Sequence, residues 1–342
     1  MRPVWILAGA TATGKTAVAQ SIAESAGAAI VSADSMLVYS GMDIGTAKPT
    51  AAERGNVPYL GIDLATPDQP FSTGAWLAAV SAQIATLPPP SPADATEPGH
   101  GIIVAGGTGL YIRALLDGID APRASAASRE HWNAVLASDG VEALQSALRE
   151  RAPSVFAVMS ESDRINPRRL TRALEIHDAD ACADSATCSV HAADAKQPPR
   201  IAVLSIEPAT LGARIARRIE RMFADGLLDE TERLRAAYPV LSDTAAAAIG
   251  YAEAFAVLDG SMSRDEAAER IAARTRQLAK RQRTWFRHQV EATPIDALSG
   301  DVRAIADATI AAWRATGPLW IPCGGTEETQ AAEEAQAAGE AQ

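Results

Sequence analysis

Short apolar runs alternate with longer amphipathic stretches along the first 120 residues of the chain. The runs at 4–8, 28–32 and 102–105 have the length and composition of buried strands. Helices are predicted at 17–26, directly after the first run, and at 72–87, before the third run. This alternation of strand and helix predicts an α/β fold with a parallel sheet flanked by helices.

The pattern changes after residue 120. Residues 123–178 have helical patterning and no strand candidate, which predicts an all-α insertion. A strand pattern returns at 201–206, so we expect the sheet to resume there. Two long helices are predicted to follow, at 210–236 and 264–290.

These changes predict a domain order. We predict that residues 1–120 form the first part of the α/β core and residues 121–178 a helical insertion. Residues 179–199 are predicted to be a flexible connection. The core is predicted to continue at 200–320 with long basic helices, and residues 321–342 to form a disordered acidic tail. The connection is rich in Ala, Asp and Ser, a composition typical of disorder. A proline-rich surface loop is predicted at 88–100.

Residues 9–16 carry the most specific motif in the chain. Their sequence matches G-x-x-x-x-G-K-T, the phosphate-binding P-loop, and lies between a predicted strand and a predicted helix. Gly9 and Gly14 allow backbone conformations that a Cβ forbids, so the loop N–H groups and the helix N-terminus can point at an anion. We expect Lys15 to reach terminal phosphate oxygens and Thr16 to ligate Mg²⁺. The predicted phosphate-binding residues are Gly9, Ala10, Thr11, Ala12, Thr13, Gly14, Lys15 and Thr16.

The motif predicts a P-loop NTPase-like core that binds a di- or triphosphate, without saying which. P-loop hydrolases usually carry an acid at the end of a central strand. Here the run 102–105 is followed by Gly106, Gly107 and Thr108 instead. This absence counts against a motor, a GTPase or an ordinary ATPase. The two glycines are expected to let the backbone come close to a ligand.

An acid does follow the second predicted strand, at Asp34. The carboxyl ends of parallel strands line the ligand crevice, so Asp34 is expected beside the phosphate-bearing ligand, with Thr108 opening onto the same crevice. A carboxylate there can accept a proton from a hydroxyl or an amine. The alternative to this catalytic role is that Asp34 only shapes a turn. Taken together, these residues favour group transfer, and both a small-molecule kinase and a transferase with a diphosphate leaving group fit.

Charge is unevenly distributed along the chain. The net charge is −11, which by itself argues against a nucleic-acid partner. However, residues 164–172, 214–221 and 270–287 hold 15 of the 31 Lys and Arg and one acid, Glu220. The local electrostatic field depends on such basic segments more than on the net charge. Any one of the three segments could be a solvated helix face. Three of them in a chain that also carries a P-loop predict a polyanionic partner.

Composition also bears on location. No apolar run reaches the roughly 18 residues of a membrane helix. The first residues lead directly into a strand, which leaves no room for a signal peptide. The three cysteines, at positions 182, 188 and 323, cannot all pair, as is usual in a reducing compartment. We expect a cytoplasmic protein with no membrane contact and no obligate protein partner.

Four segments resemble signature sequences of the tRNA dimethylallyltransferase family. They lie at 32–49, 106–111, 168–175 and 275–282, and the resemblance runs in order from residue 4 to about residue 287. Ala10 departs from the family, which often has proline there. This resemblance implies that dimethylallyl diphosphate is the donor. The acceptor it implies is the exocyclic N6 of the adenosine just 3′ of the anticodon in certain tRNAs.

The resemblance also implies residue roles. Lys15, Thr16 and Mg²⁺ would hold the diphosphate with Arg214 beside it. Asp34 would accept a hydrogen bond or proton from the amine, and Thr108 would orient the reacting groups. The implied tRNA contacts are Asp34, Ser35, Met36, Leu37, Thr108, Arg129, Arg168, Arg169, Leu170, Thr171 and Arg172. A transferase acting on free adenine nucleotides, a small-molecule kinase and a nucleotide-gated RNA-binding protein remain alternatives.

Overall fold

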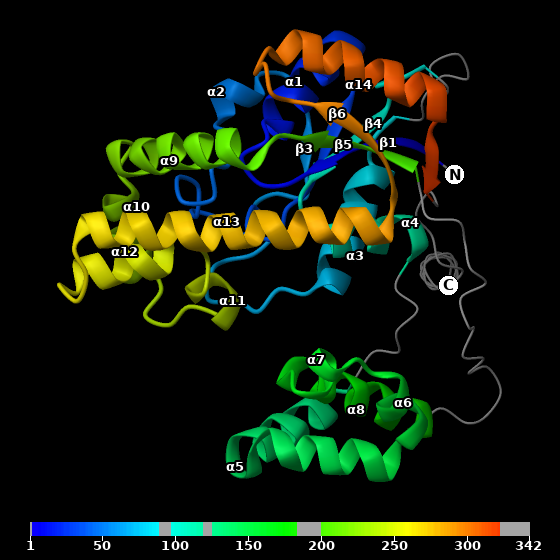
Figure 1. Ribbon diagram of the computed structural model, residues 1–342, viewed down its shortest axis with the longest axis vertical. Coiled ribbons are helices and arrows are strands. Elements are labelled where there is room, and N and C mark those ends of the chain that lie inside the picture. Colours follow the sequence, from blue (N-terminus) through cyan, green and yellow to red (C-terminus); the bar gives the residue numbers. More distant parts are fainter. Residues whose placement is uncertain (1, 89–96, 119–124, 183–199, 322–342) are drawn as a thin grey trace, which may run out of the picture. The chain divides into compact units, whose positions relative to one another are not determined.

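The computed structural model describes residues 2–88, 97–118, 125–182 and 200–321 (Figure 1). The chain divides into two compact units. The larger unit joins Met1–Gly118 to Pro198–Gln342, and the smaller unit is Ile119–Gln197. The insertion predicted at 121–178 falls within the smaller unit.

The larger unit is built on one seven-stranded sheet. Its strands are β1 (Arg2–Gly9), β2 (Ala29–Ala33), β3 (Tyr59–Leu60), β4 (Ile102–Gly106), β5 (Arg200–Ser205), β6 (Glu291–Asp296) and β7 (Leu319–Ile321). The order is β3-β2-β4-β1-β5-β6 with parallel pairing throughout, and β7 pairs antiparallel with β1. The parallel sheet predicted from the apolar runs is confirmed, with one antiparallel strand added.

Helices cover both faces of this sheet. The helices of this unit are α1 (Lys15–Ala26), α2 (Ala51–Arg54), α3 (Thr73–Ala85), α4 (Gly109–Asp117), α9 (Pro208–Ala224), α10 (Leu227–Ala237), α11 (Asp243–Ala246), α12 (Tyr251–Leu258), α13 (Arg264–Gln289) and α14 (Val302–Thr316). Alternate side chains of β1 divide between two cores. Trp5 and Leu7 pack with α1 and α14, whereas Ile6 and Ala8 pack with the core of the opposite face.

The smaller unit is helical throughout its described residues. It contains α5 (Ala126–Arg151), α6 (Pro153–Val158), α7 (Glu161–Arg164) and α8 (Pro167–Cys182). A left-handed Gly140 at φ 78° breaks α5 into two helical parts. The unit has its own apolar core, which includes Trp132, Leu144 and Leu170.

Three predicted boundaries are wrong. The single helix predicted at 210–236 is two helices, α9 and α10, because Gly226 adopts φ 98° between them. The connection predicted at 179–199 begins as the last turn of α8, and residues 183–199 lie outside the described residues. Ile321, predicted to open the tail, belongs to β7, and residues 322–342 and 89–96 also lie outside the described residues.

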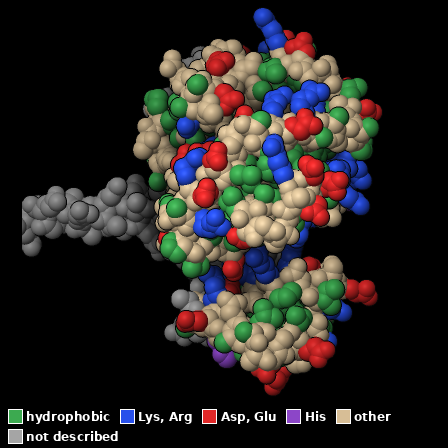
Figure 2. Space-filling model, turned by 90° about the vertical axis from the view of Figure 1, so that its left-hand side faces the viewer, with side chains coloured by type: hydrophobic (Ala, Val, Ile, Leu, Met, Phe, Trp, Pro, Cys, Tyr) green, Lys and Arg blue, Asp and Glu red, His purple; other side chains and the backbone are tan. Residues whose placement is uncertain are grey.

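The surface of the larger unit carries both signs of charge. On the face drawn in Figure 2, Lys and Arg side chains lie among acidic and hydrophobic ones. Within the described ranges, every helix is too short or too polar to cross a membrane.

Candidate active site

The P-loop follows β1 at the middle of the sheet. Gly9 lies so close to β5 that a Cβ there would be 3.0 Å from the carbonyl oxygen of Leu204. The buried Thr13 hydroxyl donates to the carbonyl of Ala10 at 2.9 Å and closes the loop on itself. Gly14, at φ 97°, then turns the chain into α1, which begins at Lys15. The loop therefore presents the N-terminus of α1 at the carboxyl end of the sheet, as the motif predicts.

Lys15 lies inside this loop. Its Nζ donates to the carbonyl oxygen of Ala10 at 2.7 Å. Burial lowers the pKa of the ammonium from 10.5 to about 8, Asp34 opposes this shift, and Arg218 adds to it. An anion bound here would raise the pKa of Lys15 again, because it stabilises the charged ammonium. Thr16, next along α1, is exposed.

Two arginines of α9 reach the loop, and only one of them was expected there. Arg214 donates to the backbone carbonyl oxygens of Thr13 (3.3 Å) and Ala297 (2.7 Å), so it braces the loop from behind. Arg218, one turn later, donates to the Thr11 hydroxyl at 3.3 Å. Burial lowers the pKa of the Arg218 guanidinium, while the negative charge of Asp34 raises it.

Arg214 beside the diphosphate stays a prediction, and Arg218 is a second candidate at the loop. Arg218 is the guanidinium whose charge acts on both Lys15 and Asp34 in this structure. The sequence carried a signal for it, because Arg218 lies in the basic segment 214–221 and four residues after Arg214. That spacing places both side chains on one helix face.

Asp34 and Thr108 lie next to each other because β2 and β4 are paired. The N–H of Thr108 donates to the carbonyl of Ala33 at 3.0 Å, and the Thr108 hydroxyl accepts the N–H of Ser35 at 3.1 Å. One carboxylate oxygen of Asp34 accepts the N–H of Met36 at 2.9 Å. This bond closes a turn, which is the structural role expected for Asp34 if it takes no part in the chemistry. The other oxygen has no hydrogen bond among the described residues.

The glycines before Thr108 are explained by protein neighbours. A Cβ at Gly106 would collide with the backbone of Ala33, and one at Gly107 would collide with the amide of Gln282. Their lack of a side chain admits β2 and α13, and the approach of a ligand to this backbone stays a prediction. Gln282, which the sequence analysis did not single out, also accepts the N–H of Thr11 at 2.8 Å.

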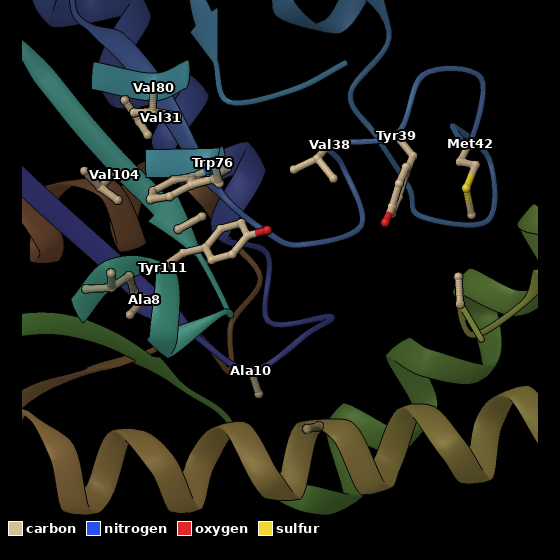
Figure 3. Packing of buried hydrophobic residues seen from close by; sticks show 14 of the residues in the cluster. Ala8, Ala10, Val31, Val38, Tyr39, Met42, Trp76, Val80, Val104 and Tyr111 are labelled. Carbon is tan, nitrogen blue, oxygen red and sulfur yellow. The ribbon is translucent and has the colours of Figure 1, made fainter. Parts of the chain in front are cut away.

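Aromatic packing holds α4, which begins just after Thr108. Trp76 of α3 stacks on Tyr111 of α4, with ring centroids 4.3 Å apart and planes inclined by 22°. Figure 3 shows the two rings facing each other beside Val31 and Val104 of the sheet. Burial raises the pKa of Tyr111, and its electrostatic interactions with Tyr39 and Asp34 act in the same direction. Tyr111 is therefore a neutral, largely apolar wall near Asp34.

The predicted tRNA contacts on the larger unit differ in exposure. Asp34, Ser35 and Met36 are partly exposed, whereas Leu37 is only 8% exposed and packs in the core. Asp34, Ser35 and Met36 therefore offer partly exposed surface, whereas the side chain of Leu37 is buried.

The predicted contacts on the smaller unit also divide. Arg168 and Arg169 are exposed, whereas Leu170 is fully buried and Thr171 is 7% exposed. The tRNA contact of Leu170 stays a prediction, and the side chain of Leu170 forms part of the core of this unit.

Arg129 and Arg172 of the smaller unit converge on one buried acid. Their guanidinium groups lie 3.2 and 3.1 Å from the two carboxylate oxygens of Glu175. Arg169 is 3.5 Å from Asp163, and the described residues contain no ion pair of Arg168.

The third basic segment forms the outer face of α13. Arg270 and Arg274 lie against the buried Glu253, at 3.7 and 2.5 Å. Further along, the exposed basic residues are Arg276, Lys280, Arg281, Arg283 and Arg287. Within the described part of the chain, none of these five forms an ion pair.

Comparison with known proteins gives one consistent result. The family model described as IPP transferase matches residues 37–289, and the one described as isopentenyl transferase matches residues 2–60. The chain is 37% identical over 321 residues to a tRNA dimethylallyltransferase of Thiobacillus denitrificans, covering 91% of this chain and 96% of that one. It is 39% identical over 311 residues to the enzyme of the same name from Bordetella pertussis, covering 89% and 95%.

Solved structures agree. A full-length tRNA isopentenylpyrophosphate transferase from Bacillus halodurans matches with a TM-score of 0.60 and 30% identity, over 92% of this chain and 98% of that chain. A eukaryotic dimethylallyltransferase acting on tRNA has the same fold, with a TM-score of 0.66 at 20% identity, over 90% and 77%. The resemblance found in the sequence is thus confirmed, and the chain belongs to the tRNA dimethylallyltransferase family.

Proposed function

We propose that this protein transfers the dimethylallyl group of dimethylallyl diphosphate to N6 of the adenosine just 3′ of the anticodon in tRNA, with release of diphosphate. The observation that carries this proposal is the pairing of a P-loop with the carboxylate of Asp34. Lys15, Arg218 and Asp34 act on one another electrostatically. Lys15 comes after β1 and Asp34 after β2, at the carboxyl ends of two strands on either side of β4. β4, the strand between them, ends in Gly106 and carries no acid that could activate water.

The cationic groups would serve the leaving diphosphate. As the bond between the allylic carbon and the diphosphate oxygen breaks, negative charge builds up on that oxygen. Lys15, Arg218 and the N–H groups at the start of α1 would stabilise this charge, since they are already held in position before the reaction. Arg214 would contribute by keeping the carbonyl of Thr13 in place.

Asp34 would act on the nucleophile. The N6 nitrogen attacks the allylic carbon, forms the new C–N bond and loses one proton. The carboxylate oxygen of Asp34 that is not bonded to Met36 can accept that proton or orient the amine. Thr108, whose hydroxyl fixes Ser35, would keep Asp34 at the correct distance. The adenine must leave the anticodon stack to reach this carboxylate.

Mg²⁺ fits the groups available. Thr16 is exposed in the first turn of α1, next to Lys15 in the chain, and its hydroxyl would supply a hard oxygen ligand. Mg²⁺ usually takes few protein oxygens and completes its shell with phosphate and water. When bound, the ion would neutralise part of the charge on the diphosphate, and Thr16 would be its main protein ligand.

The exposed cations would bind the RNA backbone. Arg168 and Arg169 on the smaller unit and the outer face of α13 on the larger unit are the candidates. Arg129 and Arg172 are also candidates, because each could leave the carboxylate of Glu175 and bind an RNA phosphate instead. Because its acceptor would be tRNA, we also propose that the protein acts in the cytoplasm, without an obligate protein partner.

Mass spectrometry of nucleosides tests this function. Unmodified tRNA is incubated with the protein, Mg²⁺ and dimethylallyl diphosphate, and we expect N6-dimethylallyladenosine in the digest. A parallel reaction offers AMP in competition with tRNA for the same labelled donor. Label in AMP would indicate a free-nucleotide transferase. Consumption of ATP with ADP release and no prenylated product would indicate a kinase.

A further inference from the structure

A buried carboxylate on α10 holds the segment that precedes Thr46. Glu230 is 5% exposed, and its oxygens accept the N–H groups of three consecutive residues. The distances are 3.3 Å to Asp43, 2.9 and 3.0 Å to Ile44, and 3.4 Å to Gly45. The hydroxyl of Tyr251 donates to the same carboxylate at 2.5 Å.

This arrangement is specific to these residues. Burial of an ionised carboxylate is costly unless several donors surround it, and here backbone and hydroxyl donors do so. Gly45 is required, because a Cβ there would collide with the ring of Tyr251. Burial, followed by the charge of Glu230, raises the pKa of Tyr251, so its hydroxyl stays protonated and keeps donating.

The held segment is connected to the phosphate site through Arg218. Its guanidinium donates to the carbonyl oxygen of Thr46 at 2.9 Å and to the hydroxyl of Thr11 at 3.3 Å. Arg218 therefore lies between the P-loop and the residue that directly follows the three N–H groups bound by Glu230. A shift of that segment would remove one of the two groups that orient the guanidinium.

The far end of the segment is fixed by different charges. Lys48 is 8% exposed, and its Nζ lies 2.7 Å from a carboxylate oxygen of Asp43 and 2.5 Å from one of Asp63. The same Nζ donates to the carbonyl of Tyr39 at 2.7 Å. The segment thus keeps its overall path without Glu230, and loss of Glu230 would affect mainly the backbone at 43–46.

We propose that Glu230, with Tyr251, is a positioning residue for the transfer reaction: it fixes the backbone at 43–46 so that Thr46 orients Arg218 toward the diphosphate. This inference rests on the proposed function for its kinetic consequences. Its binding consequences, however, concern the phosphate site alone and can be measured without any transfer.

The test is Glu230→Gln, with Glu232→Gln as a matched control, because Glu232 is exposed on the same helix. In Glu230→Gln, an NH₂ group faces backbone N–H donors. We expect its Kd for inorganic diphosphate and its KM for dimethylallyl diphosphate to rise about tenfold or more. The KM for tRNA should stay within about twofold of wild type, and Glu232→Gln should match wild type throughout. Glu230→Asp, which keeps the charge, should recover part of the loss.

Tyr251→Phe gives a second measurement if Glu230→Gln does not fold. It removes one donor from Glu230 and should weaken diphosphate affinity about threefold. A variant with a lower Tm and wild-type diphosphate affinity would mean that Glu230 serves stability alone, and the inference would fall. If wild-type protein binds diphosphate but transfers no prenyl group, the proposed function fails, whereas a weakened affinity in Glu230→Gln would still support the positioning role.

Discussion

The two P-loop arginines of the larger unit are held by different partners from Arg129 and Arg172 of the smaller unit. In the larger unit, Arg214 and Arg218 donate to backbone carbonyls and a hydroxyl, all of which are neutral. In the smaller unit, Arg129 and Arg172 share the carboxylate of Glu175. A guanidinium held by neutral groups keeps its full charge for an anion, whereas one paired with a carboxylate must exchange partners first.

This difference suits two kinds of anion. The P-loop region of the larger unit offers a few fixed cations, which suits a diphosphate of constant shape and makes binding weakly dependent on salt. The smaller unit offers exposed and exchangeable cations, which suit an RNA backbone and make binding strongly dependent on salt. The predictions that follow test this contrast.

Asp34→Asn should have the largest effect. It keeps the size of the side chain and the bond to Met36 but removes the proton acceptor, so turnover on tRNA should fall about 10²–10⁴-fold. Affinity for diphosphate should stay equal or improve, because a negative charge near Lys15 is lost. Single-turnover rates and direct diphosphate titration measure both. A rate within a few-fold of wild type would remove Asp34 from the chemistry.

Arg218→Lys should come next. Lysine keeps the charge but cannot donate at once to Thr11, to Thr46 and to an anion, so kcat/KM for the donor should fall about 100-fold. The loss should be nearly the same at low and high salt. Arg217→Lys, exposed on the same helix, is the control. Equal losses in both variants would mean that α9 contributes only general positive charge.

A double substitution in the smaller unit should produce the opposite pattern. Arg168→Ala with Arg169→Ala should raise the KM for tRNA about tenfold and reduce the salt dependence of tRNA binding by about two phosphate contacts. Donor affinity should be unchanged. Arg303→Ala, exposed on α14, provides the control. An unchanged salt slope would show that these arginines do not contact the backbone of the RNA.

The smallest expected effect is the uptake of protons by Lys15 when diphosphate binds. With a pKa of about 8, Lys15 is about half charged at pH 8, and binding of diphosphate should draw in about half a proton. Calorimetry in buffers of different ionisation enthalpy measures this uptake. Lys15→Arg, which cannot titrate, corrects for the protonation of diphosphate itself. Identical uptake in both proteins would contradict the lowered pKa.

The same shift affects stability in a defined direction. The pKa of Lys15 is lowered on folding from 10.5 to about 8. Between these two values the unfolded chain holds more protons than the folded one, so the contribution of Lys15 to the free energy of unfolding rises with pH in that window. Below pH 8 the folded state holds a charge that burial disfavours.

The sequence predicts the sheet well where strands are apolar on both faces. β1, β2 and β4 are continuous apolar runs, and their parallel pairing follows from the intervening helices. β6 was not predicted, because it contains Pro294 and only one buried residue, Ile295. It exists through its pairing with β5, from Arg200 with Glu291 to Ser205 with Asp296, and such a partner cannot be recognised from a local pattern.

The site shows the same limit at the level of single side chains. The motif fixed the identities of Lys15 and Thr16, and the acid after the second strand indicated Asp34. Arg214 and Arg218 share a helix face, so helical periodicity could not say which of them faces the loop and which braces it. That distinction depends on the distance between α9 and the backbone at Thr13 and Thr46, which only the folded structure provides.

The position of β1 between β4 and β5 has a consequence for biosynthesis. The whole smaller unit, Ile119–Gln197, separates the two neighbours of β1 along the chain. During translation, Gly9 can therefore pack against Leu204 only after β5 has been synthesised. The hydrogen bonds of Thr11 with Arg218 and Gln282 form later still, once α9 and then α13 have been synthesised. The motif is complete only once Gln282, 271 residues after Thr11, has been synthesised, so the nascent chain has no finished diphosphate site before that point.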